Sequence, residues 1–182
     1  MDAKTITNPR IFYCKIYNLG ISGDTTENLL KRFEFEAKQR IREKIVIIIF
    51  EIGINDSLFF KDKKKLTTPP KIFRRNIQKL IKLSRKFTDK IVFVGLTPVI
   101  ESEVNPLPWH KEVSYKNEYI SKYNEIIKTL CKENKVFFID TLTMWINSNY
   151  GILLEDGVHP NSEGHEKIFE IVKEFLIKNK VI

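Results

Sequence analysis

An aspartate and a histidine near the end of the chain have the spacing of an acid–base pair. Asp156 and His159 stand three residues apart in DGVHPN, a stretch that glycine and proline mark as a loop. A carboxylate there can accept a hydrogen bond from the imidazole Nδ1, which fixes the tautomer and leaves Nε2 free to act as a base. The alternatives are an aspartate turn beside a surface histidine, or a lone metal ligand. The position of the loop, directly before a predicted helix, favours the catalytic pair.

Two other loops offer hydrogen-bond donors that could stabilise a negatively charged oxygen. Asn55, in GIND, presents a side-chain NH2, and Gly23, in GISGDTT, presents a backbone N–H that no side chain obstructs. Two donors aimed at one point are what an oxyanion hole for acyl transfer requires. Each residue also has a simpler interpretation, a tight turn with positive φ at Gly23 and an ordinary turn residue at Asn55. With the Asp–His pair they form a coherent set.

Alternating strands and helices must position these loops. Residues rich in β-branched and aromatic types, or continuously apolar, predict strands over 10–20, 44–53, 90–99 and 135–143. Apolar residues at helical spacing predict helices over 25–43, after the Pro69-Pro70 pair, over 115–130 and over 168–176. This alternation predicts an α/β fold with a parallel sheet between helices. Ligands of such folds bind beyond the carboxyl ends of the strands, where the three loops converge.

Composition narrows the class of protein. A chain of 182 residues is most economically one domain, and its longest apolar run, IVIIIF, is too short to span a membrane. The first residues do not resemble a signal peptide, so a cytoplasmic location is expected. Cys14 and Cys131 have no metal-type spacing and are expected to be free thiols. The three histidines lack the spacing of metal ligands, so no metal site is expected. No phosphate-binding motif occurs, and no cofactor is expected.

The net charge of +8 raises the question of nucleic-acid binding. The basic residues are mostly lysines spread over helix faces and the loop KDKKK, and no recognition helix, zinc-finger spacing or RNA-binding aromatic motif occurs. A solvated lysine-rich surface is therefore expected, with polyanion binding as the alternative. The chain is expected to act on a small molecule and not on nucleic acid, and its oligomeric state is left open.

Three blocks of the sequence resemble the SGNH hydrolases, also called the GDSL lipase/esterase family. NLGISGDTT is similar to the second block of that family, GIND to the third and DGVHPN to the fifth, in that order over nearly the whole chain. The resemblance implies a flavodoxin-like three-layer α/β/α fold and cofactor-free hydrolysis of esters or thioesters. It also implies Gly23 and Asn55 as oxyanion-hole donors, His159 as the general base and Asp156 as its orienting partner.

The first block of the family, a strand followed by Gly-Asp-Ser with the nucleophile, has no counterpart in the sequence. None of the serines stands in a Gly-Asp-Ser context, and the stretch before Asn18 is taken up by the strand that leads into the second block. Gly23-Asp24-Thr25 resembles that motif with Thr in place of Ser. Thr25 or the neighbouring Ser22 is therefore a less favoured candidate for the nucleophile. That interpretation would remove the oxyanion glycine.

The missing block has consequences for the fold and the activity. In a sheet of order 2-1-3-4-5 the first strand is central, so without it the present first and second strands must pair with each other or leave a gap. The expectation is a single domain over residues 1–182 that lacks its first central strand, with Met1 an internal methionine of a longer reading frame. As printed, the chain is expected to be inactive. The alternative is a non-catalytic pseudoenzyme or ligand-binding module of the same fold.

Overall fold

A parallel sheet of three strands forms the centre of the protein. The computed structural model describes residues 4–6, 14–41 and 45–182. The strands lie in the order β3-β6-β8, with β3 at Ile48–Phe50, β6 at Ile91–Val94 and β8 at Phe137–Ile139. Both pairs of neighbours are parallel. The sheet confirms the predicted parallel arrangement, although each strand is shorter than its apolar run. Part of the run predicted over 44–53, residue 44, lies outside the described residues.

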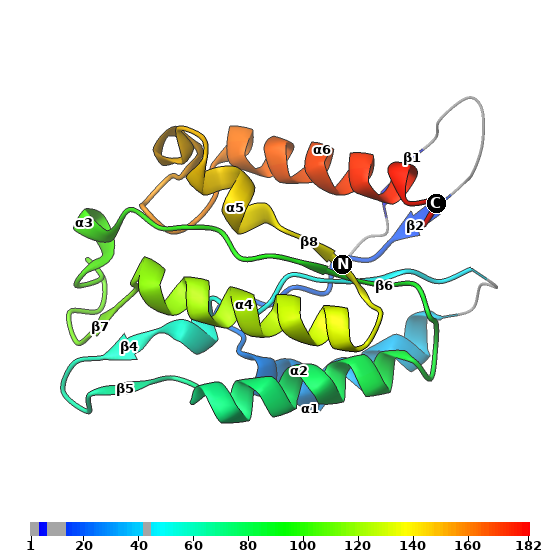
Figure 1. Ribbon diagram of the computed structural model, residues 1–182, viewed down its shortest axis with the longest axis horizontal. Coiled ribbons are helices and arrows are strands. Elements are labelled where there is room, and N and C mark those ends of the chain that lie inside the picture. Colours follow the sequence, from blue (N-terminus) through cyan, green and yellow to red (C-terminus); the bar gives the residue numbers. More distant parts are fainter. Residues whose placement is uncertain (1–3, 7–13, 42–44) are drawn as a thin grey trace.

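Helices cover both faces of this sheet (Figure 1). One face carries α1, α2 and α4, which span Thr26–Arg40, Pro70–Ser84 and Asn117–Glu133. The other face carries α6, Ser162–Lys178, with the short α5, Thr141–Ile146, between it and β8. The predicted α/β fold with helices on both sides of a parallel sheet is confirmed. No helix in the described part of the chain is both long and apolar enough to cross a bilayer.

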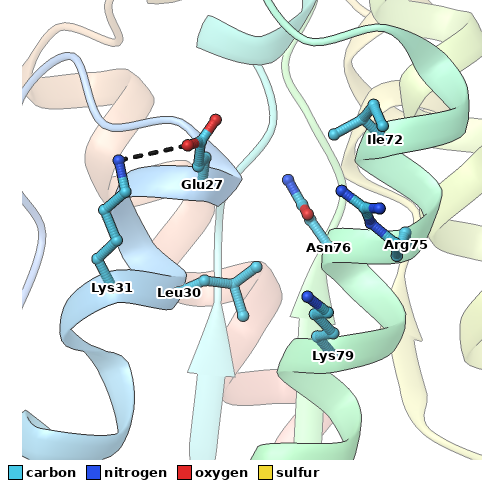
Figure 2. Close-up of a pocket in the computed structure, with 7 residues that line it drawn as sticks. All are labelled: Glu27, Leu30, Lys31, Ile72, Arg75, Asn76 and Lys79. Atoms are coloured by element: carbon cyan, nitrogen blue, oxygen red, sulfur yellow. Dashed lines mark ion pairs between the residues drawn. The ribbon is translucent and has the colours of Figure 1, made fainter.

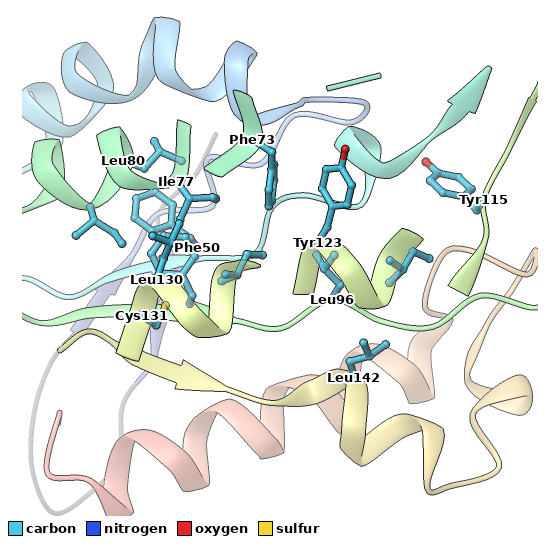
Figure 3. Packing of buried hydrophobic residues seen from close by; sticks show 14 of the residues in the cluster. Phe50, Phe73, Ile77, Leu80, Leu96, Tyr115, Tyr123, Leu130, Cys131 and Leu142 are labelled. Atoms are coloured by element: carbon cyan, nitrogen blue, oxygen red, sulfur yellow. The ribbon is translucent and has the colours of Figure 1, made fainter. Parts of the chain in front are cut away.

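The larger hydrophobic core lies between the sheet and the first layer of helices (Figure 3). Phe73, Ile77 and Leu80 of α2 are fully buried, as their helical spacing predicted. Phe50 of β3 and Phe93 of β6 meet there with ring centroids 4.8 Å apart. A smaller core on the other side of the sheet includes Val92, Val94, Ile139, Leu176 and Val181. Side chains alternate between the two cores along β6, because successive residues of a strand face opposite sides.

Helix α1 begins at Thr26, one residue later than the predicted start at residue 25. Thr25 is the N-cap, and Asn28 completes the capping box: each side chain bonds the backbone of the other residue. Asp24 and Glu27 have the sequence spacing of a capping box, but they do not form one. Asp24 is occupied elsewhere, since its carboxylate accepts two hydrogen bonds from the guanidinium of Arg32 at 2.9 and 2.7 Å. The ion pair with Arg32, two turns further along α1, therefore replaces the cap bond that Asp24 could make to the start of the helix.

A small antiparallel sheet at one end of the molecule was not predicted. Its strands are β5-β4-β7, with β4 at Phe59–Phe60, β5 at Lys65–Leu66 and β7 at Val113–Ser114. Strands of two residues carry no periodicity that a sequence could reveal. Tyr115 follows β7 and precedes α4, so the predicted helix over 115–130 is wrong at its start. The proline-rich loop before it also contains the short α3, Glu101–Val104.

The described part of the first predicted strand, residues 14–20, does not join the central sheet. Its β2 (Cys14–Ile16) pairs antiparallel with β1 (Lys4–Ile6) in a separate two-stranded sheet, and residues 10–13 lie outside the described residues. Of the two outcomes expected for the first and second predicted strands, pairing and a gap, the structure has the gap. Within the described ranges no strand pairs with the outer edge of β3, and Ile49 on that strand is 44% exposed.

Candidate active site

Asp156 and His159 form the predicted pair. The distance between Asp156 Oδ2 and His159 Nδ1 is 2.7 Å, and the other carboxylate oxygen accepts the backbone N–H groups of Val158 and His159 at 3.1 and 2.8 Å. Partial burial acts to raise the pKa of Asp156, but the hydrogen bonds from the amide and ring of His159 and from the amide of Val158 outweigh it, so the pKa lies below its ordinary value. An ionised carboxylate can hold Nδ1 protonated, which leaves Nε2 as the basic nitrogen.

The loop that carries this pair is fixed by backbone contacts. Gly157 has φ +82°, and its carbonyl accepts a hydrogen bond from the Ile100 amide at 2.9 Å. The chain then turns into α6, where Asn161 is the N-cap and accepts the amide of Gly164 at 3.0 Å. The side-chain NH2 of Asn161 donates to the Ile152 carbonyl at 2.8 Å. The DGVHPN loop is thus held at both ends, so the Asp–His geometry does not depend on the side chains alone.

Gly164 provides a test of this packing. A Cβ added there would lie 2.3 Å from the Leu153 carbonyl oxygen, which also accepts the Asn161 amide. Alanine is favoured over glycine within a helix by about 1 kcal/mol, but a clash with backbone costs more, so Gly164→Ala should lower the free energy of unfolding by about 2 kcal/mol. Urea unfolding measures it. Gly151→Ala is the matched control, since its Cβ would meet only Ile100 Cδ1 at 3.7 Å. Equal stability of the two variants would contradict the expectation.

Asn55 lies in a short 3₁₀ turn, η1 (Asn55–Ser57), that directly follows β3 and the segment around Gly53. Gly53 has φ +130°, and a Cβ there would lie 2.9 Å from the ring of Phe73, so only glycine fits this bend. The bend brings Asn55 to two partners. Its Nδ2 donates to the Asp24 carbonyl at 3.1 Å, and its Oδ1 accepts the hydroxyl of Tyr115 at 2.8 Å.

The neighbouring Asp56 fastens this turn to the start of α1. Its fully buried carboxylate accepts the amide of Thr26 at 2.9 Å and the Thr26 hydroxyl at 2.6 Å. Asn76 of α2 donates to the same hydroxyl at 3.1 Å. Burial raises the pKa of Asp56, while the hydrogen bonds from Thr26 and Thr68 oppose that rise. One buried network therefore joins α1, α2 and η1.

Gly23 lies beside Asn55, as the contact of Asn55 with the adjacent Asp24 carbonyl shows. Its φ is +79°, and the space that a Cβ would occupy is open to 4 Å. Among the described residues nothing accepts a hydrogen bond from its N–H. Arg32 fixes the turn from behind through Asp24 and through the Leu19 carbonyl at 2.8 Å. The Gly23 amide thus lies on an anchored turn beside Asn55.

The two substitute nucleophiles occupy the same turn. The Thr25 hydroxyl donates to Asn28 Oδ1 at 2.5 Å, and its oxygen caps α1. Ser22 is exposed in the turn before Gly23. In the described part of the chain, neither hydroxyl makes a hydrogen bond to His159.

Contacts between loops bring the predicted residues into one cluster. Asn55 contacts the turn of Gly23 and the hydroxyl of Tyr115. The Tyr115 amide donates to the Val104 carbonyl, and the Val104 side chain lies against Gly157 in the loop of Asp156 and His159. The indole of Trp109 stacks on the imidazole of His159 with centroids 6.3 Å apart and planes 28° from parallel. The cluster lies at the carboxyl ends of β3 and β8, where the sheet topology predicts a site.

Hollows in the surface lie beside this cluster but do not contain it. A hollow of about 140 Å³ near the ends of β3 and β6 is lined by Glu51, Ile52, Ile54, Leu96 and Thr97. A larger one of about 320 Å³ lies between α1 and α2 and includes Asn76 and the Glu27–Lys31 ion pair (Figure 2). Neither is lined by a predicted site residue. Over the described ranges, no group of three His, Cys, Asp or Glu side chains could hold a metal ion.

Three residues that shape the site were not found from the sequence. Tyr115 was placed at the start of a predicted helix, Arg32 was given no role, and Asp56 was read only as part of the GIND block. Each acts through a contact with a distant part of the chain or with another turn of its helix, which no local pattern indicates. The one available signal was Asp56, an acidic residue three positions after the predicted apolar strand over 44–53.

Comparison with solved structures supports the same fold. The protein is similar to a GDSL-like lipase from Bacteroides thetaiotaomicron, with a TM-score of 0.69 and 22% identity over 88% of this chain and 74% of that one. It is also similar to an acetylxylan esterase from Geobacillus stearothermophilus, with a TM-score of 0.62 and 22% identity over 89% of this chain and 70% of that one.

Comparison of sequences identifies the family. An arylesterase from Vibrio mimicus is 25% identical over 164 residues, which are 90% of this chain and 70% of that protein. The model of the GDSL-like lipase/acylhydrolase family matches residues 9–167. This match includes the turn of Gly23, the GIND block and the DGVHPN loop, and it spans most of the chain. The protein therefore belongs to the GDSL-like lipase/acylhydrolase family.

Proposed function

We propose that this site transfers the acyl group of a small carboxylic ester or thioester, with His159 as general base. The observation that carries the proposal is the 2.7 Å contact between Asp156 Oδ2 and His159 Nδ1, which leaves Nε2 without a partner among the described residues. The side chain of His159 is 61% exposed, so a substrate can reach it. Membership of an esterase and lipase family agrees with this chemistry.

The proposed reaction begins with attack of a hydroxyl oxygen on the ester carbonyl carbon. Nε2 of His159 takes the hydroxyl proton as the new C–O bond forms, and Asp156 stabilises the resulting imidazolium. The negative charge that develops on the carbonyl oxygen is bound by the Gly23 N–H and by the second N–H of the Asn55 carboxamide. Collapse of this intermediate breaks the bond to the alcohol, which receives the proton from His159. Water then repeats the sequence on the acyl intermediate.

In our proposal, the attacking hydroxyl group does not come from a residue of this sequence. No serine of the sequence stands in a Gly-Asp-Ser context. The cap bond of Thr25 to Asn28 argues against Thr25, because a hydroxyl that donates there is not available to His159. We therefore assign to this chain the base, its orienting carboxylate and the two oxyanion donors.

The substrate is proposed to be an ester with a flat alcohol portion. Trp109 is 57% exposed and stacks beside the base, so its ring can support an aromatic or sugar ring next to the reacting carbonyl. The arylesterase and acetylxylan esterase among the similar proteins act, by their names, on esters whose alcohol portion is of one of these two kinds. Acetate esters of nitrophenol are thus suitable first probes.

Without an added nucleophile, hydrolysis of p-nitrophenyl acetate or butyrate should be negligible. We expect the rate to equal that of the Asp156→Ala and His159→Ala variants, because a base and an oxyanion hole alone have no hydroxyl to acylate. Release of p-nitrophenolate, measured by absorbance, gives the rate. Turnover clearly above both variants would overturn this assignment and make Thr25 and Ser22 candidate nucleophiles again.

A non-catalytic module of the same fold is the second candidate. It is favoured by the same absence of a Gly-Asp-Ser serine from the sequence. The two candidates differ in what a nucleophile from solution should do. A site that retains its base and oxyanion donors acylates such a nucleophile, whereas a pure binding module does not.

A further inference from the structure

Tyr115 has a contact that neither the family blocks nor the proposed reaction uses. Its hydroxyl donates to Asn55 Oδ1 at 2.8 Å, although the two residues are 60 positions apart in the sequence. The side chain is only 5% exposed. We propose that Tyr115 is a positioning residue, whose hydroxyl holds the Asn55 carboxamide with its NH2 group towards the oxyanion. This inference rests on the proposed function, because it assigns a role within that site.

The small antiparallel sheet explains how Tyr115 reaches this place. In the pairing of β4 with β7, Phe59 lies opposite Ser114 and Phe60 opposite Val113. Continuing this register places Tyr115 across from Leu58, the residue that ends the turn containing Asn55. The amide of Tyr115 also donates to the Val104 carbonyl at 3.3 Å. Backbone pairing therefore holds Tyr115 next to the turn of Asn55 independently of the side-chain hydrogen bond.

The hydrogen bonds of the carboxamide allow only one orientation. A phenol hydroxyl that donates must face the oxygen of an amide, and the Asp24 carbonyl, which only accepts, must face the nitrogen. With Tyr115 on Oδ1 and the Asp24 carbonyl on Nδ2, both ends of Asn55 are defined. Nδ2 carries two hydrogens, so one remains for a ligand. Without the hydroxyl, the amide could rotate and present its oxygen, which would repel an oxyanion.

Tyr115 remains a donor over the whole working range of the site. Burial, with a further contribution from the negative charge of Asp156, raises the pKa of Tyr115 to about 12. Backbone contacts bring Tyr115 near the acid–base loop as well: its amide donates to the Val104 carbonyl, and the Val104 side chain lies against Gly157, the residue after Asp156. Tyr115 therefore contacts the carboxamide through its hydroxyl and neighbours the Asp156 loop through its backbone.

The test is Tyr115→Phe, which removes the hydroxyl and keeps the ring. Tyr119→Phe is the matched control, because Tyr119 packs its ring on Phe59 at 5.5 Å, and no hydrogen bond from its hydroxyl is found among the described residues. The first measurement is the ¹H–¹⁵N spectrum of the Asn55 side-chain amide, assigned with Asn55→Asp. We expect these two signals to shift and broaden in Tyr115→Phe and to remain unchanged in Tyr119→Phe, with both variants folded.

The second measurement separates a positioning role from a packing role. In acyl transfer from p-nitrophenyl acetate to hydroxylamine, Tyr115→Phe should lower kcat about tenfold and leave KM unchanged, because the contact acts on transition-state charge. Unchanged Asn55 signals, or a rise in KM alone, would overturn the proposal. Should the unsubstituted chain transfer no acyl group, the proposed function fails, and the Asn55 spectrum still decides whether Tyr115 orients the carboxamide.

Discussion

Hydroxylamine should be acetylated by the protein at the expense of p-nitrophenyl acetate, and His159→Ala should lose about 10²-fold or more of this reaction. The hydroxylamine nitrogen attacks the carbonyl carbon, its proton passes to Nε2, and p-nitrophenolate leaves. A positioned general base contributes about 10²- to 10⁴-fold to such a step. A small nucleophile can enter because the imidazole is 61% exposed and, within the described ranges, no strand lies against the outer edge of β3. Acetohydroxamate formation above the solution background is the measured quantity.

Substitution of the other site residues should also reduce the acyl transfer to hydroxylamine. Asn55→Ala removes an oxyanion donor, a change that costs about 10²- to 10³-fold in acyl transfer. Asp156→Ala leaves the base without its orienting carboxylate and should also reduce the reaction strongly. His165→Ala is the matched control: His165 is exposed in the first turns of α6, away from Asp156, and its loss should have no effect. If His159→Ala formed as much acetohydroxamate as the unsubstituted chain, the site would not be an acyl-transfer site.

The long elements were predictable because their burial follows a period. In α2 the buried residues Phe73, Ile77, Leu80 and Ile81 recur at helical spacing, and this signal alone locates the helix and its inner face. The strands β6 and β8 were found from continuous apolar runs, which indicate burial on both faces. The strand boundaries were too wide, since an apolar run continues past the residues that pair.

The N-terminal part of the sheet could not be predicted in the same way. The residues around Cys14 have the composition of a strand, and composition does not say with which strand they pair. In the structure β2 pairs with β1, at Lys4–Ile6, and not with β3. The cap of α1 shows a similar limit, because Asp24 fits a capping box locally but is drawn to Arg32 by charge.

The candidate site also contains contacts that the sequence predicts and contacts that it does not. Asp156 and His159 are three residues apart, so a loop alone can bring them into contact, and sequence reasoning found them. Asn55 owes its orientation to Tyr115, 60 residues away, through a pairing of two-residue strands. A contact of that kind depends on the assembled fold. The Asp–His contact was therefore readable from a short motif, while the position of the Asn55 carboxamide was not.

Asp56→Ala should cost the protein about 3 kcal/mol of its free energy of unfolding. The substitution leaves the Thr26 amide and hydroxyl buried without their acceptor, and each unsatisfied group costs about 1–3 kcal/mol. Some of that loss is offset, because burying the Asp56 carboxylate is itself unfavourable, as its raised pKa indicates. The unpaired donors should dominate. Urea unfolding measures the change, with Asp62→Ala in the exposed lysine-rich loop as a control expected within about 0.5 kcal/mol.

The dependence of stability on pH separates the charge of Asp56 from its hydrogen bonds. Because its pKa is raised in the folded protein, ionisation of Asp56 disfavours the fold. Stability from this group is therefore highest below the ordinary pKa of about 3.9 and declines as the pH rises through the folded value. Asp56→Asn cannot ionise, so its deficit relative to the unsubstituted protein should be larger at acidic pH and smaller near neutrality. A deficit that grew with pH would mean that the Thr26 contacts favour the charged form by more than burial disfavours it.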